Sequence, residues 1–238
     1  MKATDFEFRR RMVIILAIFA VGIFVPGFPH RISAERIAGL VDAGGRAGPS
    51  REWHLLMQGV LAAGALVTAL GALTRTWGTS YLKASVMSDS AVHSERLLAD
   101  GPFRFVRNPL YFGSILVGLG VGLMLNPLGW LWLVPALTIF YLRLIGLEES
   151  KLKAVHGESF DAYCRAVPRL FPSFLPRVEK GSARPNWGDG FLGEFWLWSL
   201  FAAMLAFALT LNIRLFNWIA LPGFMIGILL RKLRRIRR

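Results

Sequence analysis

Residues 110–147 read LYFGSILVGLGVGLMLNPLGWLWLVPALTIFYLRLIGL, two apolar runs separated by Asn126 and Pro127. Both runs approach the length of about 20 residues that a helix needs to cross the hydrocarbon core of a bilayer. Asn-Pro marks a tight turn, because proline cannot donate the backbone hydrogen bond that continues a preceding helix. The stretch therefore predicts two antiparallel transmembrane helices, and it brings the residues before position 110 close to those after position 147.

The composition of the whole chain is that of a membrane protein. Of its 238 residues 54% are hydrophobic, and the mean hydropathy is +0.47, so a soluble domain is disfavoured. The sequence predicts an all-α, multi-pass transmembrane helical bundle with about six spans. The four additional spans are expected at residues 12–28, 55–73, 195–211 and 215–230.

Two of these segments carry further information. The first has the charged start and apolar core that signal peptides share, but no small-residue cleavage motif follows Pro29, so a retained span is favoured. The second contains Gly59, Gly64 and Gly71, which would permit close approach of a neighbouring helix.

The charge distribution predicts the orientation. Lys and Arg number 28 against 15 Asp and Glu, a formal net charge of +13. Nucleic acid is not the expected partner, because the cations flank the apolar segments instead of forming one soluble basic face. An even number of spans puts both termini on one side, and the basic clusters at residues 9–11 and 231–238 identify that side as cytoplasmic. The connections at residues 74–108 and 148–193 share it, so the cofactor-binding loops are expected to be cytoplasmic.

Metal chemistry is not expected from this sequence. The single cysteine, Cys164, excludes an intrachain disulfide and a cysteine-rich metal site. The four histidines show no metal-ligand spacing, and no Gly-rich phosphate loop precedes a lysine.

The predicted hairpin places Arg107 near Glu148 and Glu149 at the membrane boundary. A carboxylate at the edge of hydrocarbon is costly unless it has a partner, so such groups mark functional sites. In an alternative reading, Glu149 forms a surface ion pair with Lys153, four residues later on the same helix. If Glu148 faces the site, it shares a helical face with Tyr141, and it should then matter more for cofactor binding than Glu149.

An ordered set of short motifs carries a resemblance over residues 75–176. In chain order they are Gly101-Pro102-Phe103, Arg107-Asn108-Pro109-Leu110-Tyr111-Phe112-Gly113, Gly118-Leu119-Gly120, Glu148-Glu149, Gly157, Tyr163 and Val167-Pro168-Arg169. The set resembles the integral-membrane methyltransferases, which include the isoprenylcysteine carboxyl methyltransferases and the phospholipid N-methyltransferases. The resemblance implies a helical membrane fold whose cytoplasmic end closes over S-adenosylmethionine, with a lipid substrate reaching the methyl group from within the bilayer.

The resemblance also implies roles for individual residues. The family's Arg-His-Pro-x-Tyr element falls on residues 107–111, and its paired glutamates fall on residues 148 and 149. The implied catalytic residues are Arg107 and Glu148. The implied cofactor-binding residues are Asn108, Tyr111, Gly118, Gly120, Glu148, Glu149 and Tyr163. Asn108 stands where the family usually has histidine; an amide still donates and accepts hydrogen bonds, but it does not take up a proton near neutral pH.

Structural alternatives stay open for several of these residues. Arg107 either binds an anionic group through its guanidinium or anchors the helix by snorkelling. Tyr111 would also suit an interfacial aromatic belt, and Gly118 and Gly120 would suit plain helix packing. The segment around Tyr163 forms either a lid over the site or half-buried interfacial packing.

Three functions are compatible with these features. The favoured one is S-adenosylmethionine-dependent methyl transfer to the carboxylate or amine of a lipid or isoprenoid-type substrate, which mainly requires a positioned nucleophile and a dry pocket. A membrane reductase of the sterol-reductase type would bind NADPH in the corresponding place, but the short cytoplasmic connections leave less room for a dinucleotide. A non-catalytic scaffold does not explain why Arg107 and the glutamates converge.

The chain is expected to have three parts. They are an N-terminal transmembrane hairpin with an interfacial loop at residues 1–74, a methyltransferase-like core at residues 75–180, and a C-terminal transmembrane hairpin with a basic tail at residues 181–238.

Overall fold

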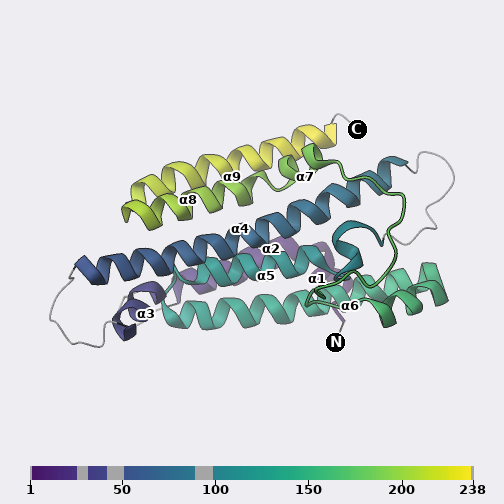
Figure 1. Cartoon of the computed structure of the whole chain (residues 1–238), viewed down its shortest axis with the longest axis horizontal. Coiled ribbons are helices and arrows are strands. Elements are labelled where there is room, and N and C mark those ends of the chain that lie inside the picture. Colours follow the sequence, from purple (N-terminus) through teal and green to yellow (C-terminus); the bar gives the residue numbers. More distant parts are fainter. Residues whose placement is uncertain (1, 26–31, 42–50, 89–98, 237–238) are drawn as a thin grey trace.

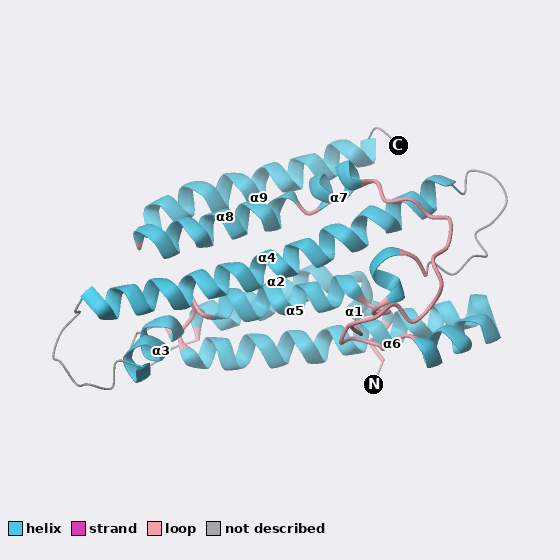
Figure 2. Cartoon of the chain, viewed as in Figure 1, coloured by secondary structure: helices cyan, strands magenta, loops and turns pink. Residues whose placement is uncertain are grey.

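The computed structural model describes residues 2–25, 32–41, 51–88 and 99–236. Figure 2 shows that these residues form helices joined by loops, without a strand among them. The prediction of an all-α bundle is therefore confirmed for the described residues. In chain order the elements are α1 (Asp5–Arg9), α2 (Arg11–Phe24), α3 (Ser33–Val41), α4 (Arg51–Ser88), η1 (Gly101–Arg104), α5 (Pro109–Gly122), α6 (Pro127–Ala166), α7 (Trp187–Gly193), α8 (Phe195–Thr210) and α9 (Ile213–Ile236).

The expected apolar segments all contain helices, but their described residues do not make six full spans. Among the described helices, α4, α6 and α9 are long and apolar enough to cross a bilayer. α7 and α8 together make a fourth candidate that is bent by 62°. α2 and α5 have 14 residues each, about 21 Å of helix against about 30 Å of hydrocarbon. The predicted count of about six is thus corrected to three, or four with the bent pair; residues 26–28 of the first expected span lie outside the described residues.

α4 is the central helix and packs against α3, α5, α7 and α8. Glycines allow its close contact with α5. A Cβ atom added at Gly71 would lie 2.5 Å from the carbonyl oxygen of Gly113, and one added at Gly120 would collide with the backbone of Gly64. Small residues let membrane helices approach in this way. The expected packing roles of Gly64 and Gly71 are confirmed, whereas that of Gly59 is wrong, since a Cβ there meets no described atom within 4 Å.

α5 and α6 are packed together as the predicted hairpin. Asn126 caps α6 by accepting a hydrogen bond from the backbone N–H of Gly129 at 2.9 Å. Pro127 takes the first helical position, where a missing N–H costs nothing. At the same turn the backbone N–H of Ser33 donates to the carbonyl of Leu125 at 2.7 Å, so the start of α3 is tied to the end of α5.

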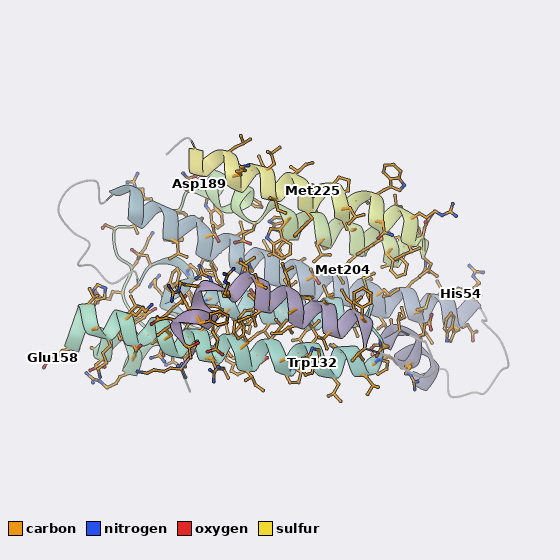
Figure 3. All side chains as sticks on the ribbon, turned by 180° about the vertical axis from the view of Figure 1, so that it is seen from behind. His54, Trp132, Glu158, Asp189, Met204 and Met225 are labelled. Atoms are coloured by element: carbon orange, nitrogen blue, oxygen red, sulfur yellow. The ribbon has the colours of Figure 1, made fainter. Side chains whose placement is uncertain are left out.

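The bundle has two distinct ends. Figure 1 shows α1, η1, the start of α5 and the last turns of α9 at one end, and α3 at the other. Figure 3 shows Glu158 and Asp189 toward the first end and His54 at the opposite one. α6 continues past the bundle at the first end and bends at Gly157, where φ is +53°. We call this end, which holds residues 100–111 and the second half of α6, the site end.

The connection between α6 and α7 lies along the segment that precedes α5 and is hydrogen-bonded to it. The backbone N–H of Arg107 donates to the carbonyl of Pro168 at 2.9 Å. The buried carboxylate of Asp100 accepts a hydrogen bond from the backbone N–H of Gly181 at 2.6 Å. These bonds place residues 167–181 beside η1 and bring the end of α6 toward the start of α5.

Candidate functional site

The chain turns sharply where α5 begins. Pro109 is the first helical residue, and Asn108 before it has φ −125° and ψ 60°, because proline disfavours helical geometry in the residue that precedes it. The Asn108 side chain makes no capping bond to α5. Its amide nitrogen instead donates to Glu149 Oε1 at 3.2 Å and to the carbonyl of Arg169 at 2.9 Å. The start of α5 is thereby joined to α6 and to the connection that follows it.

Glu149 is the centre of this polar cluster. Arg107 Nε lies 3.2 Å from Glu149 Oε1, and Arg169 Nε lies 3.0 Å from Glu149 Oε2. The Arg107 contact is an ion pair only, since its Nε has no aligned hydrogen-bond partner among the described residues. The expected alternative pair with Lys153 is wrong, because Lys153 Nζ lies 2.9 Å from Asp161. One carboxylate, with 16% of its side chain exposed, therefore holds two cations and an amide.

Arg107 is fixed by the end of α6. Its Nη1 donates to the carbonyl of Cys164 at 2.9 Å, and only 12% of its side chain is exposed. A snorkelling anchor would extend toward the headgroups, so that alternative does not describe Arg107. The predicted convergence of Arg107 with the paired glutamates is confirmed by its contact with Glu149.

Glu148 faces a different neighbour. The hydroxyl of Tyr111 donates to Glu148 Oε1 at 2.8 Å, and the rings of Tyr111 and Tyr141 are 5.3 Å apart. Successive residues of a helix point about 100° apart, so adjacent glutamates reach different groups. The expected face shared by Glu148 and Tyr141 is confirmed, and the site end contains two neighbouring carboxylates in different surroundings.

Three other predicted site residues, Tyr163, Gly118 and Gly120, contact neighbouring segments of the bundle. The hydroxyl of Tyr163 donates to the carbonyl of Phe103 at 2.7 Å, and this tyrosine is 8% exposed. A Cβ added at Gly118 would lie 2.9 Å from Leu137 Cδ1, and Gly120 faces α4. These contacts hold η1 against α6 and hold α5 between its neighbours. The contact of all three residues with a cofactor stays a prediction.

A second polar cluster lies outside the predicted site residues. Arg75 Nη2 in α4 lies 3.0 Å from Glu194 Oε1 at the bend between α7 and α8, and Arg75 Nη1 donates to Ser114 Oγ at 2.7 Å. The sequence signal is an arginine inside an apolar helix, since ionisable groups at such positions are costly and often functional. Arg169, which the sequence shows only as part of the Val-Pro-Arg motif, is also a direct neighbour of Glu149.

The residues at the site end fit S-adenosylmethionine chemically. Its amino acid moiety carries a carboxylate and an ammonium group. The guanidinium groups of Arg107 and Arg169 suit a carboxylate, and the carboxylates of Glu148 and Glu149 suit an ammonium group. Arg169 is the most open of the groups around Glu149, with 42% of its side chain exposed.

Comparison with known proteins identifies the same part of the chain. Residues 60–159 match the phospholipid methyltransferase family. Over 70 residues, 29% of the chain, the sequence is 40% identical to the methanethiol S-methyltransferase of Crocosphaera subtropica. The matched segment spans 27% of that relative's length. No solved structure matches the chain.

The matched family segment contains most of the site. It includes residues 107–111 and the paired glutamates, whereas Arg169 and Glu194 lie beyond it. The family and the relative are both methyltransferases, and the fold is a bundle with helices long and apolar enough to cross a membrane. Residues 60–159 are thus similar to the phospholipid methyltransferases, and the apolar helical bundle fits an integral-membrane methyltransferase.

Proposed function

We propose that the protein transfers a methyl group from S-adenosylmethionine to a lipid or isoprenoid-type amphipathic substrate, at a carboxylate or amine, on the cytoplasmic face of the membrane. The observation that supports this most is the cluster around Glu149 of α6, on which Arg107 and Asn108 from the segment before α5 and Arg169 from the connection after α6 converge. Charged groups of both signs at the end of an apolar bundle suit a zwitterionic cofactor met by a membrane-soluble acceptor.

In this proposal the cluster binds and orients the cofactor. Arg107 and Arg169 bind its carboxylate, and Glu149 binds its ammonium group. Asn108, which bonds to Glu149 and to the Arg169 carbonyl, keeps these partners at a fixed separation. When bound, S-adenosylmethionine supplies an electrophilic methyl group on a sulfonium.

Glu148 and Tyr111 form the side of the proposed site that faces the acceptor. Their 2.8 Å hydrogen bond holds the Glu148 carboxylate of α6 against Tyr111 in the first turn of α5, whose ring lies beside that of Tyr141. Glu148 can accept a hydrogen bond from an amine and orient its lone pair. Positioning of this kind is the main requirement for displacement at a methyl group.

An apolar groove on α6 supports an amphipathic acceptor. The groove has a volume of about 340 Å³ and is lined as far as Arg143, five residues before Glu148. A lipid or prenyl chain lying along it would have its polar end toward the site. The groove is lined by Leu131, Trp132, Pro135, Ala136, Ile139, Phe140 and Arg143.

A small thiol is a second candidate acceptor. The observation that favours it is the 40% identity over 70 residues to a relative named for S-methylation of methanethiol. A thiolate is a stronger nucleophile than a carboxylate, so it would need less activation by Glu148.

Methyl-labelled S-adenosylmethionine tests the proposal and separates the two acceptors. Membranes that contain the protein are incubated with it, with and without added methanethiol, and the lipid extract and the headspace are counted separately. We expect label in the lipid extract, and we expect Glu149→Gln membranes to lose it. Label confined to volatile dimethyl sulfide would identify the thiol as the acceptor, and absence of label from both fractions would contradict methyl transfer.

A further inference from the structure

Arg75 and Glu194 form an ion pair inside the bundle, between α4 and the bend that joins α7 to α8. Arg75 Nε and Nη2 donate to Glu194 Oε2 and Oε1, each at 3.0 Å. Thr79 Oγ1 donates to the same carboxylate at 2.9 Å. Only 18% of the Arg75 side chain and 4% of the Glu194 side chain are exposed. The guanidinium is thus held in one orientation by a bidentate contact.

The remaining guanidinium nitrogen of Arg75 reaches the first turn of α5. Arg75 Nη1 donates to the carbonyl of Leu110 at 3.2 Å and to Ser114 Oγ at 2.7 Å. Ser114 Oγ donates to the same Leu110 carbonyl at 2.9 Å. This turn follows Asn108 and carries Tyr111. A charged pair outside the predicted site therefore contacts the turn that carries one predicted site residue and directly follows another.

Glycines permit both sides of this contact. A Cβ added at Gly113 would lie 2.7 Å from Arg75 Cγ, and a Cβ added at Gly190 would lie 2.7 Å from the carbonyl oxygen of Thr76. A side chain at either position would push α5 or α7 away from α4. The two glycines thus leave room for the ion pair where α4, α5 and α7 meet.

Stability alone does not explain a buried ion pair. Removing two charges from water is costly, and apolar side chains of similar volume are often at least as stabilising. A bidentate pair differs from apolar packing because its hydrogen bonds have fixed directions. At this junction those directions run from the α7–α8 bend, through α4, to the first turn of α5.

We infer that Arg75 and Glu194 are positioning residues, which set the placement of the first turn of α5 and hence of Asn108 and Tyr111. Glu194 lies beyond residues 60–159, so the C-terminal helices contribute to a site that the family segment carries. The consequence for cofactor binding rests on the proposed function. The placement of the turn does not depend on the proposed function, and it can be measured without cofactor.

Glu194→Gln is the test variant, because it keeps the shape of the side chain and removes its charge. Glu7→Gln is the matched control. Glu7 Oε2 lies 2.8 Å from Arg143 Nη2 in a pair that joins α1 to α6 and has no part in the junction of α4, α5 and the α7–α8 bend. Hydrogen bonding to Arg143 lowers the pKa of Glu7 to about 2, so this carboxyl is ionised at neutral pH.

Hydrogen exchange in peptides covering residues 103–115 gives the direct readout on cofactor-free protein. We expect faster exchange there in Glu194→Gln and wild-type exchange in Glu7→Gln. We also expect Glu194→Gln to weaken binding of S-adenosylhomocysteine roughly threefold to thirtyfold, as energetic coupling through a packed network does, while Glu7→Gln leaves it unchanged. Wild-type exchange at residues 103–115 in folded Glu194→Gln would overturn the inference.

Two further outcomes are decided by the same experiment. If Glu194→Gln does not fold, the double variant Arg75→Gln/Glu194→Gln replaces it, because it leaves no uncompensated buried charge. Wild-type protein that binds no S-adenosylhomocysteine would contradict the proposed function, while the exchange comparison would still decide whether the ion pair positions the turn.

Discussion

At the scale of single residues, Glu148 and Glu149 are adjacent in the chain but differ in their partners. Spacing alone favours Glu148 for cofactor binding, whereas the structure places Arg107 and Arg169 around Glu149. We therefore expect Glu149→Gln to weaken cofactor binding more than Glu148→Gln. Loss of a charge-assisted hydrogen bond should cost about 1.5 to 3 kcal/mol, on the order of tenfold to a hundredfold in affinity. Calorimetry with S-adenosylhomocysteine measures both, and a larger loss in Glu148→Gln would contradict this order.

Asn108 tests whether a neutral amide is sufficient at the position where the resemblance implies a histidine. It donates to Glu149 and to the Arg169 carbonyl, so imidazole, which can also donate, should preserve most of the activity in Asn108→His. Asn108→Leu is similar in size but has no donor, and it should raise the apparent cofactor constant by the loss of a hydrogen bond of about 0.5 to 1.5 kcal/mol. Thermal unfolding in detergent checks that both variants fold. Wild-type affinity in folded Asn108→Leu would remove Asn108 from the site.

At the scale of helices, the contact between α4 and α5 depends on glycine. A Cβ in Gly120→Ala would collide with Thr68 and with the backbone of Gly64, and overpacking of this kind typically costs about 1 to 3 kcal/mol. Gly59→Ala is the matched control, because its Cβ meets no described atom within 4 Å; it should be neutral or stabilise the helix by about 0.5 to 1 kcal/mol. Thermal unfolding compares them, and equal effects would show that close helix contact is unimportant.

The helix ends are where the sequence is least informative. Residues 115–125 are apolar throughout, yet α5 ends at Gly122. The next backbone N–H groups tighten into a turn, with Leu123 bonded to Gly120 at 3.2 Å and Leu125 bonded to Gly122 at 3.0 Å. Hydrophobicity is the same on both sides of that boundary, so pattern alone predicts a longer span than the one that forms.

At the scale of the whole molecule, local signals predict the hairpin but not the outer junction. The turn at Asn126 and Pro127 is encoded in adjacent residues, and it is sufficient to bring Arg107 near the glutamates. The pair of Arg75 and Glu194 joins residues 119 positions apart. It depends on how α7 and α8 dock onto α4, which no short motif specifies.

Orientation is also a property of the whole molecule. Figure 1 shows α1 and the end of α9 at the same end of the bundle as the start of α5. Because the flanking basic residues favour the cytoplasm, reporters fused after Arg238 and inserted at residues 89–95 should both report a cytoplasmic location. A reporter signal from the opposite side at either position would contradict this orientation, because it would place the site away from the cytoplasmic cofactor.

The most direct measurement is a calorimetric titration of the purified protein with S-adenosylmethionine and, separately, with NADPH. The charged cluster around Glu149 suits a zwitterionic amino acid moiety, so we expect the wild-type protein to bind S-adenosylmethionine and Glu149→Gln to bind it more weakly. We expect no binding of NADPH by either protein. Selective binding of NADPH by the wild-type protein would contradict the methyltransferase assignment of this site and favour a membrane reductase.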